Sequence, residues 1–122
     1  MIFAKTADKV LAGEKTQTRR PVKLGESFNG IEVYSESGTL KWRVWNTYAV
    51  QPGRTAKSVG RIQLTNIRIE RIYQITNADA RAEGFSGRDE FARVWKELYP
   101  KDGSFFDRVY VLEFELVKEK TE

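Results

Sequence analysis

The densest group of polar side chains lies in residues 13–21, which read GEKTQTRRP. If this stretch is extended, alternation places Thr18 and Arg20 on one face and Lys15 and Arg19 on the other. Such a row of hydroxyl, ammonium and guanidinium donors suits a phosphate, a carbonyl oxygen or the edge of a base. The same composition suits a charged edge strand that prevents aggregation. Composition alone leaves both interpretations open.

The chain contains neither histidine nor cysteine, which limits the chemistry that this group could perform. Imidazole and thiolate catalysis, disulfides and Cys/His zinc sites are all excluded. A threonine nucleophile would need a base, and Lys15 is the nearest one to Thr18 in the sequence. Lysine acts as a base only when burial or a nearby cation lowers its pKa. Arg19 and Arg20 are candidate neighbours for that purpose.

A second candidate is the stretch at residues 51–60, QPGRTAKSVG, which reads as a long loop between two strands. Arg54 and Lys57 lie within it among small residues, and Arg61 follows directly. Small residues let a backbone approach a phosphate closely, and cations add affinity. The alternative is a solvated loop with no ligand.

Trp45 is the aromatic residue that departs from the apolar alternation of residues 41–50. An exposed tryptophan can stack on a nucleic-acid base. Trp42 and Trp95 follow the periodicity of their elements, so we expect them to pack in the core. Trp45 is therefore the preferred stacking candidate.

Four stretches of the chain together resemble the ASCH domain, a family of the PUA-like superfamily. They are residues 12–21 (AGEKTQTRRP), 48–54 (YAVQPGR), 78–85 (ADARAEGF) and 109–114 (VYVLEF), in that order. The resemblance implies a compact β-barrel with helices packed beside it. It also implies a cleft that binds RNA or a nucleoside.

Some small bacterial ASCH proteins that resemble this chain hydrolyse the acetyl amide of N4-acetylcytidine. The resemblance implies Lys15 as proton acceptor, Thr18 as nucleophile and Glu83 as proton donor, with Arg20 at the arginine of the same run. The chain departs from that subgroup at Arg19 and Pro21 and in its extra QPGR loop. Other members are ribonucleases or RNA-binding modules, so these functions remain alternatives. For Glu83, a purely structural ion pair with the basic cluster is a further alternative.

One geometric difficulty accompanies this set of residues. Lys15 and Thr18 are three residues apart, so a regular strand points them to opposite faces. We expect them to cooperate only if the chain turns between them.

The elements that must position these residues indicate an α+β domain spanning residues 1–122. We expect a small, mainly antiparallel β-barrel with about three short helices at its side and ends, and an open sheet with helices on one face as the second choice. Phase shifts in the 61–72 segment predict bulges near residues 65–66 and 70–71. The expected strands are 2–3, 15–20, 31–33, 41–50, 61–72 and 109–117. We expect a first helix capped by Thr6 that runs through residues 11–12, a short second helix over 79–83 capped by Thr76 or Asn77, and a longer third helix capped by Ser86 that reaches residue 98.

The charge distribution indicates an anionic partner. Residues 1–75 carry 13 Lys and Arg against 6 Asp and Glu, whereas the chain as a whole has a net charge of +4. RNA or a modified nucleoside is the expected partner, and no cofactor or metal site is expected. With no apolar run of membrane length and no signal peptide, we expect a cytoplasmic protein with no membrane contact.

Overall fold

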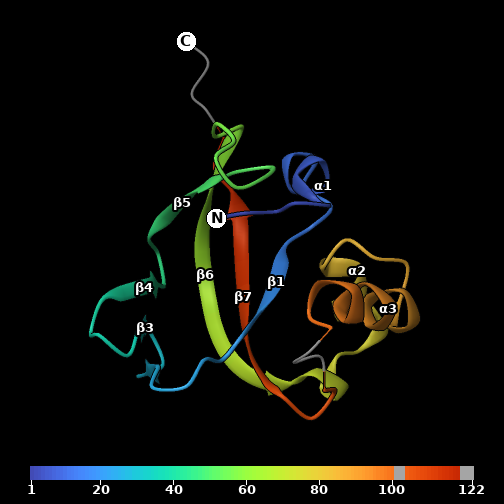
Figure 1. The fold of residues 1–122 in the computed structure, drawn as a ribbon. Helices are drawn as coiled ribbons and strands as arrows, with labels where there is room; N and C mark the ends of the chain where they lie inside the picture. The colour runs from blue at the N-terminus through green and yellow to red at the C-terminus, as the bar shows by residue number, and fades with distance from the viewer. Residues whose placement is uncertain (101–103, 119–122) are drawn as a thin grey trace.

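The computed structural model describes residues 1–100 and 104–118 of the 122-residue chain (Figure 1). It confirms the predicted α+β class. The elements are α1 Ala7–Leu11, β1 Gln17–Pro21, β2 Ser27–Phe28, β3 Glu32–Tyr34, β4 Leu40–Arg43, β5 Thr47–Val50, β6 Gly60–Arg71, the 3-10 turn η1 Ile72–Gln74, α2 Asn77–Ala82, α3 Arg88–Leu98 and β7 Arg108–Leu116. The predicted helices and most of the predicted strands are present.

The strands form two antiparallel sheets. One has the order β1-β7-β6-β5 and curls into a half-barrel around the long strand β6, and the other has the order β2-β3-β4. The register between β6 and β7 shifts between Leu64 and Asn66, which confirms the bulge predicted near residues 65–66. A bulge bends its strand and increases the twist, so it helps the sheet to curl.

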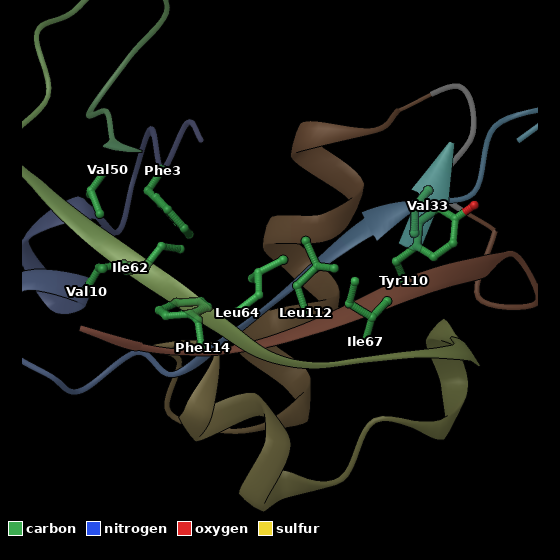
Figure 2. Packing of buried hydrophobic residues seen from close by; sticks show 10 residues of the cluster. All are labelled: Phe3, Val10, Val33, Val50, Ile62, Leu64, Ile67, Tyr110, Leu112 and Phe114. Atoms are coloured by element: carbon green, nitrogen blue, oxygen red, sulfur yellow. The ribbon is translucent and has the colours of Figure 1, made fainter. Parts of the chain in front are cut away.

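Strand β7 is buried on both of its faces over its first half. Tyr110, Leu112 and Phe114 point into the half-barrel, where they pack in a cluster with residues such as Ile62 and Leu64 (Figure 2). On the opposite face, Val109 and Val111 pack against a second cluster that includes Phe91 and Trp95 of α3. Successive side chains of β7 alternate between the two clusters, so the second cluster holds α3 against the outer face of the sheet.

Two short helices, α2 and α3, lie beside β1 and β7 (Figure 1). Thr76 caps α2 as predicted, because its hydroxyl accepts from the Asp79 backbone N–H at 3.0 Å. In α3, Phe91, Val94 and Trp95 are buried, as their helical spacing predicts. This places the aromatic face of α3 next to the edge of the sheet.

Three local predictions were wrong. Residues 41–50 form two strands in different sheets, because the backbone turns at Trp45, whose φ is +75° and whose N–H donates to Leu64 O at 2.7 Å. The second bulge is absent, since the β6–β7 register runs unbroken to Arg71 before η1 begins. Ser86 does not cap α3. Instead, the side chain of Asn77 accepts from the backbone N–H of Arg88 at 3.0 Å, a tertiary contact that sequence spacing does not reveal.

Within residues 1–100 and 104–118, no helix is long and apolar enough to cross a membrane. In the same part of the chain, no group of three acidic side chains is arranged to hold a metal ion.

Candidate functional site

The candidate site lies along the free edge of β1, the edge that does not face β7. Among the described residues, no strand other than β7 pairs with β1 in its sheet. Thr18 pairs with Leu112 and faces the half-barrel, whereas Arg19 pairs with Val111 and faces the helices. Lys15 lies just before the strand and also reaches the helix side, where it contacts Glu83. The backbone N–H of Thr16 donates to Ala82 O at 2.7 Å, which ties the start of β1 to the end of α2.

A cavity of about 210 Å³ opens at this edge, between β1, the N-terminal segment and α3. We call it the site cavity. Its polar lining includes Lys15, Thr18, Arg19, Arg20 and Glu83, and its aromatic lining consists of Phe3, Phe85, Phe91, Trp95 and Tyr99. Lys15 and Thr18 thus line one cavity. The backbone N–H of Lys15 donates to Lys9 O at 3.1 Å, so Lys15 still belongs to the turn after Gly13 and not to the strand that carries Thr18. An edge strand exposes both of its faces to a cavity that runs along the edge.

Lys15 and Glu83 form a buried ion pair at the centre of the polar lining. The Nζ of Lys15 lies 3.0 Å from Glu83 Oε1 and 2.6 Å from the backbone oxygen of Glu83. Each side chain is 4% exposed. Burial lowers the pKa of Lys15, Arg20 and Arg19 lower it further, and Glu83 opposes the change. The surroundings of Lys15 therefore lower its pKa, which is the change that a general base requires.

Gly84 makes the close approach of Lys9 possible and also lies beside Lys15. This residue follows the C-cap of α2 with φ of +97°, a conformation that favours glycine. A Cβ on Gly84 would lie 3.1 Å from Lys9 Cδ and 3.7 Å from Lys15 Cβ. Lys9 donates to the backbone oxygen of Gly84, so two lysines contact the carbonyl end of α2.

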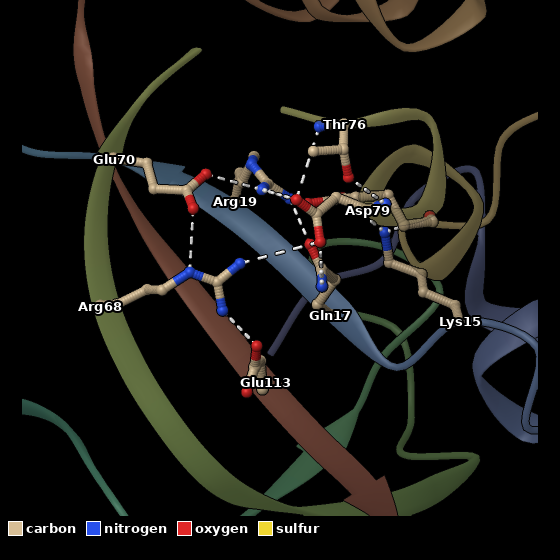
Figure 3. Close-up of polar contacts among 9 residues, drawn as sticks. Lys15, Gln17, Arg19, Arg68, Glu70, Thr76, Asp79 and Glu113 are labelled. Atoms are coloured by element: carbon tan, nitrogen blue, oxygen red, sulfur yellow. Dashed lines mark hydrogen bonds and ion pairs between the residues drawn. The ribbon is translucent and has the colours of Figure 1, made fainter. Parts of the chain in front are cut away.

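Arg19 has a fully buried side chain that contacts Glu83. It also belongs to a wider charge network with Glu70, Asp79 and Arg68 (Figure 3). Its Nη1 lies 3.1 Å from Glu83 Oε2, and its Nη2 lies 3.0 Å from Glu70 Oε1 and 3.6 Å from Asp79 Oδ2. Arg68 continues the network through Glu70, Asp79 and Glu113, and Arg19 Nη1 also donates to Gln17. The sequence predicted a ligand-binding role for Arg19, and the structure places three carboxylates around it.

Arg20 closes the cavity beside the N-terminal segment. Its Nη2 donates to Ile2 O at 2.7 Å, and its guanidinium lies 5.4 Å from the centre of the Phe3 ring. Burial lowers the pKa of Arg20, although the group stays charged at neutral pH. Three buried nitrogens on the cavity lining, Arg19 Nε, Arg20 Nε and Trp95 Nε1, have no hydrogen-bond partner in the structure as described. Each of these N–H groups can donate a hydrogen bond to a ligand oxygen or ring nitrogen.

Four other predicted binding residues lie outside this cavity. Trp45 is 65% exposed in the turn between β4 and β5. Arg54 and Lys57 are exposed in the loop between β5 and β6, and Arg61 on β6 donates to Thr47 at 2.9 Å. None of them lines the site cavity, so the structure does not bring them together with Lys15, Thr18 and Glu83.

The aromatic lining was not predicted from the sequence as part of the site. Trp95 was assigned to the core, and it is indeed 4% exposed, but it also lines the cavity. The spacing of Phe91 and Trp95 shows that they share one face of α3. It does not show that this face lies against the free edge of β1, because that contact depends on the tertiary fold. Phe3 and Phe85 come from unrelated parts of the chain, and no periodicity connects them.

The comparisons with known proteins identify the fold. A solved structure from Enterococcus faecalis V583, described by the family model DUF984, superposes with a TM-score of 0.67 at 20% identity. It covers 97% of this chain and 73% of its own. An ASCH domain from Lactobacillus crispatus JV V101 superposes with a TM-score of 0.61 at 21% identity over 90% of this chain and 69% of its own. The chain has the ASCH fold.

This result confirms the predicted ASCH-like, PUA-like α+β architecture, with a half-barrel sheet and three short helices. No family model and no curated protein sequence matches the chain. At these identities the ASCH fold is shared, whereas the function of the site must be argued from its own residues.

Proposed function

We propose that the site cavity binds a single base of RNA or of a modified nucleoside. The observation that supports this most strongly is the combination of an aromatic wall with a buried polar lining. Phe85, Phe91 and Trp95 supply aromatic surface against which a base can pack, and Lys15 and Thr18 supply polar atoms for the edge of a base. Proteins recognise unpaired bases in this way.

The size of the cavity favours a base over a larger ligand. Drug-sized ligands occupy cavities of about 300–1,000 Å³, and this one measures about 210 Å³. The cavity also opens along a strand edge, so a sugar and its substituents can remain outside. A cytoplasmic location, which the sequence predicts, is part of this proposal.

Hydrolysis of an amide on the bound base is the second candidate function, and the lowered pKa of Lys15 favours it. In this scheme the Thr18 hydroxyl attacks the acyl carbon while its proton passes to Lys15, directly or through a water molecule. The 3.0 Å contact between Lys15 Nζ and Glu83 Oε1 offers the proton a route to Glu83. Glu83 then protonates the leaving amine, and water hydrolyses the acyl ester on Thr18.

The test uses purified protein with cytidine and N4-acetylcytidine as probes. Binding is measured by calorimetry, and turnover is measured by release of acetate and cytidine. Thr18→Val removes the hydroxyl and keeps the branched shape, so it should retain binding and abolish turnover. Thr65→Val, at the bulge of β6 outside the cavity lining, is the matched control and should behave like the parent protein.

The outcomes separate the two functions. Turnover that Thr18→Val abolishes and Thr65→Val preserves would support the hydrolase. Binding without turnover would leave the base-binding function and remove the hydrolase. If neither cytidine nor N4-acetylcytidine nor a short single-stranded RNA binds at low salt, the base-binding proposal is wrong.

A further inference from the structure

A second cavity, of about 560 Å³, lies at the other end of β1. We call it the basic cavity. Three cationic side chains and a single carboxylate contribute to its lining. The lining consists of Pro21, Val22, Lys23, Leu24, Arg71, Trp95, Tyr99, Asp107 and Arg108.

Arg71 and Arg108 are directly opposite each other across β6 and β7. Like charges in this arrangement destabilise a sheet, since the two guanidinium groups repel. Arg71 Nη1 donates to the backbone oxygen of Phe106 at 2.6 Å, which is a neutral partner. Over residues 1–100 and 104–118, no carboxylate forms an ion pair with Lys23, Arg71 or Arg108. By contrast, Arg19 and Arg68 each contact at least two carboxylates.

The basic cavity is adjacent to the site cavity. Trp95 and Tyr99, whose ring centres are 4.4 Å apart, line both of them. Along β1, Arg20 lines the first cavity and the next residue, Pro21, lines the second. A ligand that places its base against Trp95 and Tyr99 in the site cavity therefore has the basic cavity, with its three cationic side chains, directly beside it.

We propose that the basic cavity binds a phosphate attached to the nucleoside whose base occupies the site cavity. This inference rests on the proposed function and makes it more specific. The ligand is then a phosphorylated nucleoside, either a mononucleotide or one unit of an RNA strand, and a free nucleoside fills only half of the site.

The chemistry of the three cations supports phosphate as the ligand group. Arginine presents a planar fork of donors that matches phosphate oxygens in pairs, and lysine adds a compact charge. A phosphate, monoester or diester, brings negative charge between Arg71 and Arg108 and so relieves their repulsion; binding therefore gains from an unfavourable contact in the free protein. The indole N–H of Trp95, on the shared wall, has no partner among the described residues and can donate to a ligand oxygen.

The test compares four probes by calorimetry at about 50 mM salt, where phosphate contacts are strong. The probes are cytidine, cytidine 3′-monophosphate, cytidine 5′-monophosphate and tetracytidylate. The proteins are the parent, Arg108→Gln, Arg71→Gln and Arg81→Gln. Arg81 is the matched control, because it is exposed on α2, lines neither cavity and forms no ion pair within the described residues.

We expect at least one phosphorylated probe to bind the parent about 10-fold or more tightly than cytidine, as charge-assisted hydrogen bonds to one phosphate allow. Arg108→Gln and Arg71→Gln should each lose most of this gain and bind cytidine as the parent does. Arg81→Gln should keep the gain. A gain limited to the monophosphates would identify a mononucleotide ligand, and a gain limited to tetracytidylate would identify RNA.

Two results would overturn different parts of the account. If cytidine binds but no phosphorylated probe binds more tightly, or if the gain survives in both arginine variants, the phosphate subsite is wrong and the base cavity stands. If no probe binds the parent at all, the proposed function itself fails. Thermal unfolding provides a second measurement, since inorganic phosphate should stabilise the parent more than it stabilises Arg108→Gln.

Discussion

Replacing Glu83 by glutamine removes the negative charge at the centre of the site and keeps the shape of the side chain. In the parent, the Glu83 carboxylate lies 3.0 Å from Lys15 Nζ and 3.1 Å from Arg19 Nη1. The side chains of Lys15 and Glu83 are 4% exposed, and that of Arg19 is 0% exposed. The substitution therefore leaves two buried cations with a weaker partner.

The expected cost follows from these contacts. Removing one partner of a buried ion pair costs about 3–5 kcal/mol. The lower end applies here, because the amide oxygen of glutamine still accepts one hydrogen bond and Arg19 keeps Glu70 at 3.0 Å. We expect a loss of about 3 kcal/mol in the free energy of unfolding, or a fall of about 12 °C in Tm at roughly 4 °C per kcal/mol for a chain of this size.

Urea unfolding at pH 7 measures this loss, with Glu70→Gln as the matched control. Glu70 also contacts Arg19 at 3.0 Å, but its side chain is 19% exposed. Water compensates part of that change, so the control should lose about 1 kcal/mol. The loss in Glu83→Gln should also persist at high salt, because buried pairs are poorly screened. A loss below about 1 kcal/mol, or equal losses in the two variants, would refute the description of Glu83 as the buried centre of the network.

Three further predictions concern pH and backbone conformation. Burial, with help from Glu26, raises the pKa of Tyr110 from 10.0 to about 12, so the folded chain holds this proton more tightly than the unfolded chain does. The free energy of unfolding should therefore fall by about 3 kcal/mol between pH 10 and 12. In urea unfolding, Tyr110→Phe should remove that fall. Burial lowers the pKa of Lys15 from 10.5, so the folded chain holds that proton less tightly than the unfolded chain does. The free energy of unfolding should therefore rise with pH from the lowered pKa towards 10.5. A Lys15→Met variant that keeps the same rise would contradict the lowered pKa of Lys15. Gly84→Ala, at φ of +97°, should cost about 1–2 kcal/mol in thermal unfolding, and an unchanged Tm would show that the backbone there is not constrained.

The sequence predicted the elements that have strong local signals. The capping threonine and the glycine stop of α2, the apolar face of α3 and the doubly buried start of β7 each depend on nearby residues, and each is present. The break at Trp45 was missed because a non-glycine residue with positive φ is held there by a hydrogen bond from another strand. The start of α3 was missed for the same reason, since its capping group comes from Asn77.

The site shows the same division between local and tertiary information. Residue type and the family resemblance singled out Lys15, Thr18 and Glu83, which line one cavity. The ion pair between Glu83 and the basic cluster was one of the alternatives that the sequence left open, and the structure contains it. The sequence did not reveal the aromatic wall, nor that Glu70 and Asp79 also contact Arg19, because those groups come from separate segments that only the fold brings together. The sequence also did not show where Trp45 and the 51–60 loop lie relative to Lys15, and the fold places them outside the site cavity.

The central claim is that the cavity between β1 and α3 binds a base. Its most direct test is a titration of ¹⁵N-labelled protein with N4-acetylcytidine, followed through the three tryptophan indole N–H signals. Trp95 lines the cavity and has an unpartnered indole N–H, whereas Trp45 is exposed in a distant turn. We expect the Trp95 signal to shift in a saturable manner while the Trp45 signal stays in place. A saturable shift of Trp45 with Trp95 unchanged, or no shift at millimolar ligand, would contradict the account.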